Sequence, residues 1–112
     1  MSGKSSQRKG ADAERELAEI LRGYGYQIRR GGSLSFGEVP DLSGLPGVHI
    51  EVKRVERLNL AGAMGQAVRD SKVFGGMPTV FHRRNRAPWM VTMRLEDWMV
   101  IYGAGCSDNM ET

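Results

Sequence analysis

Cysteine is almost absent from this chain, since Cys106 is the only one among 112 residues. A single thiol excludes an internal disulfide framework and a zinc site built on several cysteines, so we expect a reducing, cytoplasmic environment. Long apolar runs are also lacking. None approaches the roughly 18 residues of a membrane span, and we expect neither a signal peptide nor a membrane partner. These absences predict an intracellular protein.

Neither sign of charge dominates the sequence. The chain has 16 Lys and Arg against 13 Asp and Glu, which gives a formal net charge of +3 and a pI near 9.4. This mild basic excess is compatible with a polyanionic partner but does not identify one. The length suits one modest core, so we expect a single domain over residues 1–112, with flexible tails at residues 1–6 and 104–112.

One alternating stretch in the middle of the chain organises the rest. β-Branched apolar residues alternate there with polar ones: Val48, Ile50 and Val52 with His49, Glu51 and Lys53. This period predicts a half-buried strand whose apolar face points into the core. Upstream, Asp41 follows Pro40, and a hairpin through residues 44–47 is expected to bring Asp41 alongside Glu51. Two converging carboxylates with Lys53 beside them predict a Mg²⁺ site for phosphodiester hydrolysis.

The segment from about residue 7 to 22 has the period of an amphipathic helix, which glycines then end. Its apolar stripe consists of Ala13, Leu17, Ile20, Leu21 and Tyr24. Glu14 and Glu16 lie on opposite rims of this stripe, so each is able to reach a site at the edge of the core. The alternative for either acid is a solvated charge paired with a neighbouring arginine. Periodicity nominates the two acids equally.

The remaining segments alternate between strand and helix patterns. Strands are expected at residues 26–30, 78–82 and 89–93, and helices at residues 60–74 and 95–101. Together with the central strand, this order predicts an α/β fold in which a mixed sheet is flanked by helices. The polar loop 31–39 contains Ser33 and follows Arg29 and Arg30. It either holds phosphates or is an ordinary surface connection.

Four segments have the order and spacing of a known enzyme family. They are Arg8-Lys-Gly-Ala-Asp-Ala-Glu-Arg-Glu-Leu17, Gly25-Tyr-Gln-Ile-Arg-Arg30, Pro40-Asp-Leu42 and Ile50-Glu-Val-Lys53. Taken alone, the Glu-x-Lys triplet also fits an exposed strand face with opposite charges. Together, over about residues 8–53, the segments resemble the archaeal-type Holliday junction resolvases of the PD-(D/E)xK nuclease superfamily. The resemblance implies a restriction-endonuclease-like core.

The resemblance also implies a chemistry. It implies a Mg²⁺-dependent endodeoxyribonuclease, with Mn²⁺ able to substitute, that resolves four-way DNA junctions by paired phosphodiester hydrolysis. The implied catalytic residues are Glu14, Asp41, Glu51 and Lys53. The three acids are the implied metal ligands, and Glu16 is at most a supporting residue. Superfamily members often carry a polar residue near the position of Gln66, which is either a supporting residue or an exposed amide.

A four-way junction has two equivalent strands to cut, so the resemblance implies a C2 homodimer acting on branched DNA. The candidate interface residues are Trp98, Met99, Val100 and Ile101. Candidate DNA contacts are Arg8, Lys9, Arg29, Arg30, Ser33, Arg54, Arg83 and Arg84. His49 shares a strand face with Glu51, but neither His49 nor His82 has a second His or Cys at ligand spacing. Both histidines are expected to be structural or surface residues.

Two departures from the archaeal pattern bear on junction preference more than on nuclease chemistry. The loop 31–39 is longer, and the hairpin 43–47 differs in composition. Resolvase-like proteins of this size also occur in bacteriophages and prophages, so either source fits. One rival function is another PD-(D/E)xK endonuclease of nicking, flap or restriction type, with the same catalytic residues. The other is a non-catalytic DNA-binding subunit, which the presence of all four catalytic residues argues against.

Overall fold

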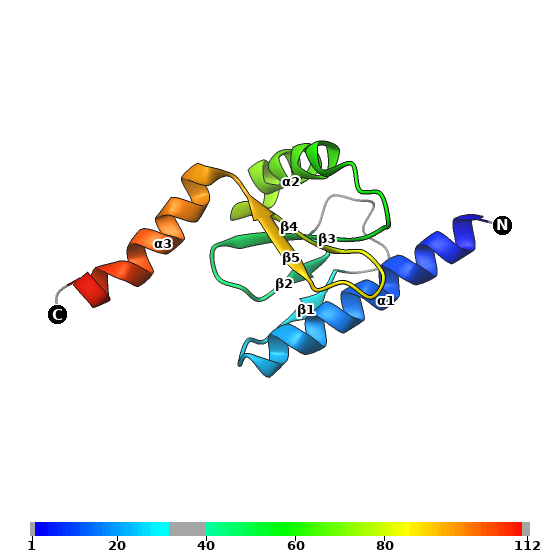
Figure 1. Ribbon diagram of the computed structural model, residues 1–112, viewed down its shortest axis with the longest axis horizontal. Helices are drawn as coiled ribbons and strands as arrows, with labels where there is room; N and C mark the ends of the chain where they lie inside the picture. Colours follow the sequence, from blue (N-terminus) through cyan, green and yellow to red (C-terminus); the bar gives the residue numbers. More distant parts are fainter. Residues whose placement is uncertain (1, 32–39, 111–112) are drawn as a thin grey trace.

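The computed structural model describes residues 2–31 and 40–110, with the side chains of residues 10–31 and 40–105. In chain order the elements are α1 (Ser2–Gly23), β1 (Arg29–Arg30), β2 (Leu42–Ser43), β3 (Val48–Arg54), α2 (Leu60–Phe74), β4 (Met77–Arg83), β5 (Met90–Met93) and α3 (Leu95–Met110). The strands form one five-stranded sheet in the order β1-β2-β3-β4-β5 (Figure 1). Neighbouring strands are antiparallel except β3 and β4, which are parallel and joined through α2. The predicted α/β fold with a mixed sheet is confirmed.

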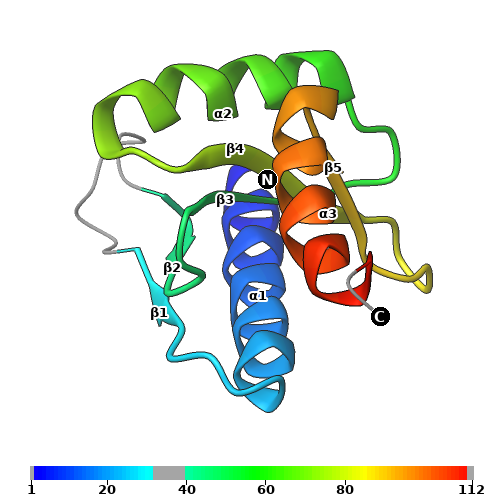
Figure 2. The same ribbon diagram turned by 90° about the vertical axis from the view of Figure 1, so that its left-hand side faces the viewer.

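Helices α1 and α2 cover opposite faces of the sheet (Figure 2). The larger core cluster packs Ala13, Leu17 and Leu21 of α1 against a sheet face that carries Ile50 and Phe81. Two residues of the predicted apolar stripe, Ile20 and Tyr24, are instead exposed. The smaller cluster lies on the other face, where Ala63 and Ala67 of α2 contact Val80. Because alanine side chains are short, α2 lies close to the strands beneath it. Helix α3 instead extends away from the sheet (Figure 1).

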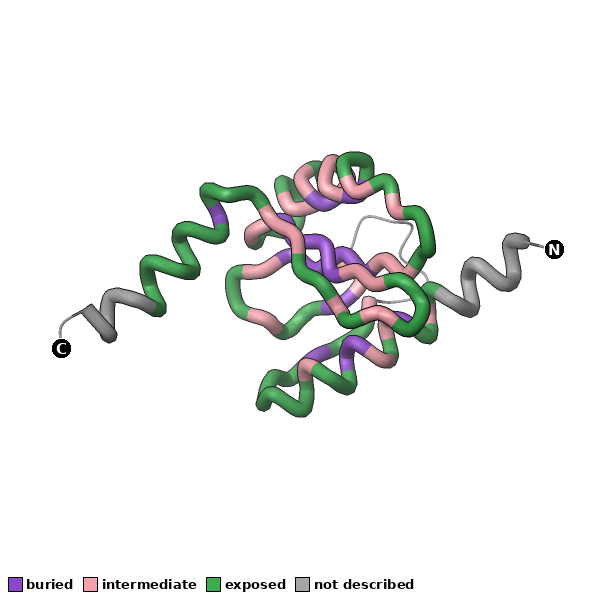
Figure 3. Tube along the Cα trace, in the orientation of Figure 1, coloured by how far each residue is buried: buried purple, intermediate pink, exposed green. Residues whose placement is uncertain are grey.

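Strand β3 is buried on both faces. The strand itself was predicted correctly, but the prediction that only its apolar face would be buried was wrong. His49 and Glu51, expected on an open polar face, are each only 2% exposed. Figure 3 shows burial concentrated in the central strands and the inward sides of α1 and α2. Parallel neighbours require a crossover connection, which here is α2, and that helix covers the second face. The polar residues of β3 therefore lie beneath α2.

Helices α1 and α3 are longer than their sequence patterns indicate. Helix α1 begins at Ser2 instead of near residue 7, and α3 continues to Met110 instead of ending near residue 101. Residues 2–6 and 104–110, expected to lie in tails of loop composition, are therefore helical. No proline interrupts either segment, so each helix extends by one hydrogen bond per added residue. Of the described helices, none combines the length and apolar character that crossing a bilayer requires.

The turn before β3 determines where Asp41 lies. Leu42 of β2 pairs with Ile50 of β3 in antiparallel register, which confirms the predicted hairpin. Gly44 leaves β2 with a φ of +120°, a conformation that residues with a side chain rarely adopt. A Cβ on Gly44 would also clash with the backbone carbonyl oxygen of Gln27. This glycine therefore allows the hairpin to pack beside the segment that precedes β1.

We expect Gly44→Ala to reduce the free energy of unfolding by about 2–3 kcal/mol, because it adds both backbone strain and a clash with backbone atoms. Gly47→Ala is the matched control. Gly47 has a φ of +79°, but no atom lies within 4 Å of a Cβ built on it, so we expect a loss of only about 1 kcal/mol. Urea denaturation measures both variants. Equal losses would show that the close approach to Gln27 contributes nothing.

Candidate functional site

Two hydrogen bonds tie Asp41 to β3. Its backbone N–H donates to the carbonyl of Ile50 at 3.1 Å, and its Oδ2 accepts from the N–H of Val52 at 2.7 Å. In the register of the hairpin, Asp41 therefore lies opposite Glu51, the residue between these two partners. Burial raises the pKa of Asp41, while the Val52 hydrogen bond and the charge of Lys53 oppose that rise.

The carboxyl group of Glu51 is buried beneath α2. Burial, followed by the charges of Asp41 and Asp70, raises the pKa of Glu51 to about 8, and Lys53 opposes the rise. Glu51 Oε1 lies 3.3 Å from Nε2 of His49. Burial lowers the pKa of His49, which favours a neutral imidazole. At neutral pH Glu51 therefore holds a proton unless a cation takes the place of that proton.

Lys53 lies two residues after the buried Glu51 on β3 and lines an open cavity. Its Nζ donates a hydrogen bond to Oε1 of Gln66 on α2 at 3.5 Å. Both residues line a cavity of about 380 Å³ that also borders Asn59 and Gly62 at the start of α2. A substrate phosphate in this cavity would lie near the side chain of Lys53. The structure thus places Gln66, the predicted supporting residue, in contact with the predicted catalytic lysine.

Of the two helix acids that periodicity nominated equally, Glu14 faces the strands that carry the site. It accepts a hydrogen bond from Arg30 of β1 at 3.2 Å. Burial, followed by the negative charge of Asp41, raises the pKa of Glu14, whereas Arg30 lowers it. Asp41 is therefore close enough to influence the ionisation of Glu14. The role of Glu14 as the helix carboxylate of the site stays a prediction.

Glu16, on the other rim of α1, links that helix to β4 and to the residue before β5. Its carboxylate accepts two hydrogen bonds from Arg83, at 2.7 and 3.0 Å, and one from Nε1 of Trp89 at 2.7 Å. Hydrogen bonding to Arg83 lowers the pKa of Glu16. The Arg83 side chain is only 12% exposed, and its guanidinium lies 5.7 Å from the centroid of the Trp89 ring. Arg83 therefore has a structural role in this fold, and its contact with DNA stays a prediction.

The three predicted metal ligands contact different partners: Glu14 contacts Arg30, Asp41 contacts Val52, and Glu51 contacts His49. Among the described residues, one group of three or more metal-ligand side chains has ligand atoms that all lie within 4.8 Å of one another: His49, Glu51 and Asp70. The predicted triad of Glu14, Asp41 and Glu51 is not such a group, and its role as a metal centre stays a prediction. Asp41 nevertheless lies near both other acids, since its charge raises the pKa of Glu14 and the pKa of Glu51.

Asp70 is a candidate ligand that sequence reasoning did not nominate, and His49 is one that it considered and set aside. Asp70 lies on α2 one turn after Gln66, and residues four apart on a helix share one face. The helix that follows a Glu-x-Lys strand covers the polar face of that strand, so the spacing of Gln66 and Asp70 was a usable signal. His49, expected to be a structural or surface residue, has a fully buried side chain in contact with Glu51.

The other candidate DNA contacts lie on several elements. Arg29 and Arg30 are exposed on β1, and Arg54 at the end of β3 donates to Oδ1 of Asn85 at 3.3 Å. Arg84 is exposed in the β4–β5 turn. Ser33 lies outside the described residues, and so do the side chains of the two basic residues at positions 8 and 9 of α1.

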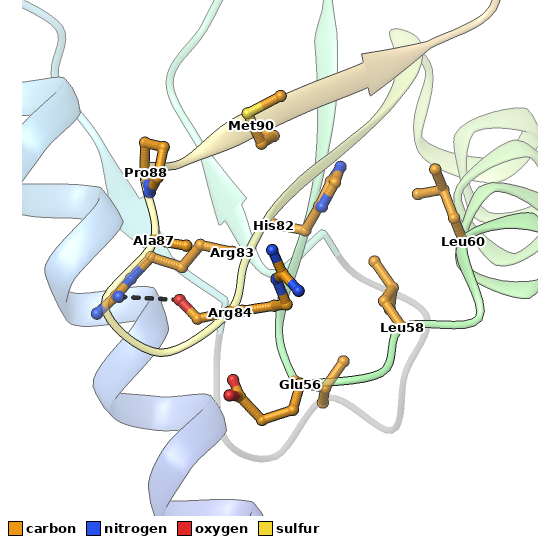
Figure 4. A pocket seen from close by; sticks show the side chains of 10 residues that line it. Glu56, Leu58, Leu60, His82, Arg83, Arg84, Ala87, Pro88 and Met90 are labelled. Carbon is orange, nitrogen blue, oxygen red and sulfur yellow. Dashed lines mark hydrogen bonds between the residues drawn. The ribbon is translucent and has the colours of Figure 1, made fainter.

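A second cavity of about 380 Å³ lies next to the β4–β5 turn. Figure 4 shows the charged side chains of Glu56 and Arg84 at one side of this cavity and the apolar side chains of Leu58 and Leu60 at another. None of the four predicted catalytic residues lines it. This cavity is therefore separate from the group around Glu51.

Comparison with known proteins identifies the family of this chain and a solved structure with a similar fold. The family model described as archaeal Holliday junction resolvase (Hjc) matches residues 5–100. The solved structure of Hjc from Archaeoglobus fulgidus, a Holliday junction resolvase from an archaeal hyperthermophile, is similar at a TM-score of 0.58 and 28% sequence identity, over 76% of this chain and 72% of that one. No curated protein matches the chain. Because the family model spans most of the chain and a family structure shares its fold, this protein belongs to the archaeal Holliday junction resolvase family of junction-cleaving endonucleases.

Proposed function

We propose that this chain is a Mg²⁺-dependent endodeoxyribonuclease that resolves four-way DNA junctions by paired phosphodiester hydrolysis. The observation that carries the proposal is the pair Asp41, just before β2, and Glu51 on β3, which lie opposite each other in the hairpin register. The charge of Asp41 raises the pKa of Glu51, as expected for two acids that share a cation. Lys53 follows on the same strand at the edge of an open cavity. Membership of the resolvase family supports the choice of branched DNA as the substrate.

The donor set fits a hard divalent cation. Mg²⁺ prefers oxygen ligands and combines one or two carboxylates with water and substrate phosphate oxygens. Asp41 and Glu51 would hold the ion, with the Val52 carbonyl as a third oxygen, and Glu14 would complete its shell or help to hold a second ion. Mn²⁺ accepts the same oxygen ligands, so we expect it to substitute. When bound, the ion supplies a Lewis acid that activates water and neutralises phosphate charge.

The residues around the ion supply orientation and charge. Lys53 would stabilise the negative charge that develops on a non-bridging phosphate oxygen, because its ammonium faces the cavity. Gln66 positions that ammonium through its hydrogen bond to Nζ. Binding of a cation requires Glu51 to lose its proton, since the neutral carboxyl is a poor ligand. The proposed mechanism therefore couples metal uptake to deprotonation of a buried acid.

We infer a C2 homodimer, because two equivalent strands of a junction need two active sites. Helix α3 supports this inference. It projects from the sheet (Figure 1) and carries Trp98, Met99, Val100 and Ile101, whose exposed fractions range from 44 to 63%. Exposed apolar patches of this kind mark interaction surfaces. An enzyme of this type would meet its DNA inside the cell.

The proposal is tested by comparing cleavage of a four-way junction, a flap, a duplex and a single strand at equal concentration, with and without Mg²⁺. We expect paired symmetric nicks on the junction, only in the presence of Mg²⁺ or Mn²⁺. Equal cleavage of flap or duplex would favour another endonuclease of the same superfamily. Binding of branched DNA without cleavage of any substrate would indicate a non-catalytic DNA-binding subunit. Raising the salt concentration should weaken DNA binding nearly equally for all sequences.

A further inference from the structure

Beneath α2 lies a compact group of metal-ligand side chains that the proposed nuclease uses only in part. The ligand atoms of His49, Glu51 and Asp70 all lie within 4.8 Å of one another. His49 and Glu51 come from β3, and Asp70 comes from the crossover helix that covers this strand. Only Glu51 has a role in the proposed reaction. The structure therefore leaves an imidazole and a carboxylate beside Glu51 with no assigned function.

Two polar atoms of this group are buried and have no hydrogen-bond partner among the described residues. They are Nδ1 of His49 and Oδ2 of Asp70. The side chain of His49 is 0% exposed, so water does not reach its ring. Because a buried polar atom without a partner is costly, native proteins pair nearly all such atoms or use them to bind a ligand. An imidazole nitrogen and a carboxylate oxygen are both ligand atoms for transition metals.

The backbone that carries the group is held on rigid elements. His49 pairs with Pro78 of β4 in the parallel register. Gly76 packs directly against the backbone of His49, since a Cβ on Gly76 would lie 2.8 Å from the backbone nitrogen of His49. Helix α2, which carries Asp70, packs on the sheet through Ala67, which is fully buried in the cluster with Val80. The three ligand side chains are therefore brought together by the packing of the fold, before any ion binds.

We propose that His49, Glu51 and Asp70 form a binding site for a divalent transition-metal ion, of which Zn²⁺ is the preferred probe. Imidazole suits Zn²⁺ and its neighbours, whereas Mg²⁺ takes oxygen ligands, so the nitrogen of His49 distinguishes the two ions. Glu51 belongs both to this group and to the proposed Mg²⁺ position. If the proposed function holds, Zn²⁺ bound here therefore inhibits Mg²⁺-dependent cleavage.

Isothermal titration calorimetry with Zn²⁺ tests this site in the absence of DNA. The protein for this titration should carry the Cys106→Ser substitution and no histidine tag, so that no thiol or added imidazole binds the ion. We expect one Zn²⁺ per chain and a loss of at least about 10-fold in affinity for Asp70→Asn and for His49→Gln. His82→Gln is the matched control, because Nε2 of His82 already contacts Oγ1 of Thr92 at 2.8 Å. Unchanged affinity in Asp70→Asn, or a loss in His82→Gln, overturns the proposal.

A second readout keeps the proposal testable if His49→Gln fails to fold. The chain has only 2 histidines, so their ring nitrogens are readily separated by NMR. Zn²⁺ should shift the ring signals of His49 and leave those of His82 unchanged, and the reverse pattern overturns the proposal. Asp41→Asn separates the site from the nuclease. We expect this variant to bind Zn²⁺ normally without cleaving DNA, and loss of Zn²⁺ binding in it would assign the ion to the nuclease centre instead.

Discussion

Replacing Glu51 with glutamine should reduce junction cleavage by at least about 1,000-fold while DNA binding persists or tightens. The amide keeps the shape of the side chain but is a poor ligand for a cation that contributes several kcal/mol at the transition state, and each ~1.4 kcal/mol is a factor of ten in rate. Binding should not fall, because glutamine adds no negative charge near the phosphate and cannot become ionised as Glu51 can. Single-turnover cleavage and a gel mobility-shift titration measure the two effects separately.

Two further variants define how specific this loss is. Asp41→Asn should lose cleavage to a similar degree, since its Oδ1 still accepts the Val52 hydrogen bond and the fold is kept. Glu96→Gln removes one exposed acid on α3 and should cleave at the rate of the parent chain. Cleavage by Glu51→Gln or Asp41→Asn at near the parental rate would reject the assigned site. A large loss in Glu96→Gln would show that total charge, and not metal binding, controls the rate.

Without metal, the chain should lose on the order of 2–4 kcal/mol of stability between about pH 5.5 and pH 8.5. Burial raises the pKa of Glu51 from 4.5 to about 8 in the folded state, so the folded chain holds a proton that the unfolded chain releases over this range. The stability contributed by that proton is complete below pH 4.5 and is lost as the pH rises through about 8. The raised pKa of Asp41 acts in the same direction. Urea denaturation at several pH values measures the loss.

Mg²⁺ should restore this stability, because the ion binds the ionised carboxylates of the folded chain. We expect Mg²⁺ to raise the melting temperature clearly at about pH 8.5 and hardly at about pH 5.5. Glu51→Gln should flatten the pH dependence and remove most of the Mg²⁺ effect, whereas Glu96→Gln should retain both. A parent chain whose stability is independent of pH would show that Glu51 is not protonated when the metal is absent.

The sequence by itself determined the features that depend on near neighbours. The alternation around Glu51, the Pro40-Asp41 pair and the following glycines predicted the hairpin, because strand period and turn conformation are local properties. The order of motifs over residues 8–53 was sufficient to indicate the family. Even local reasoning failed at the helix ends, where α1 and α3 extend beyond the amphipathic pattern because neither meets a proline.

Only the tertiary structure decided which side chains meet. Glu14 and Glu16 were equal by periodicity, and the docking of α1 on the sheet placed the first near Asp41 and made the second a structural link. The crossover helix buried a strand face that alternation predicted to be open, which raised the pKa of Glu51 and brought Asp70 to it. Helix and strand periods depend on residues a few positions apart, so a sequence displays them directly. Contacts between layers depend on how whole elements pack, and no local pattern contains that information.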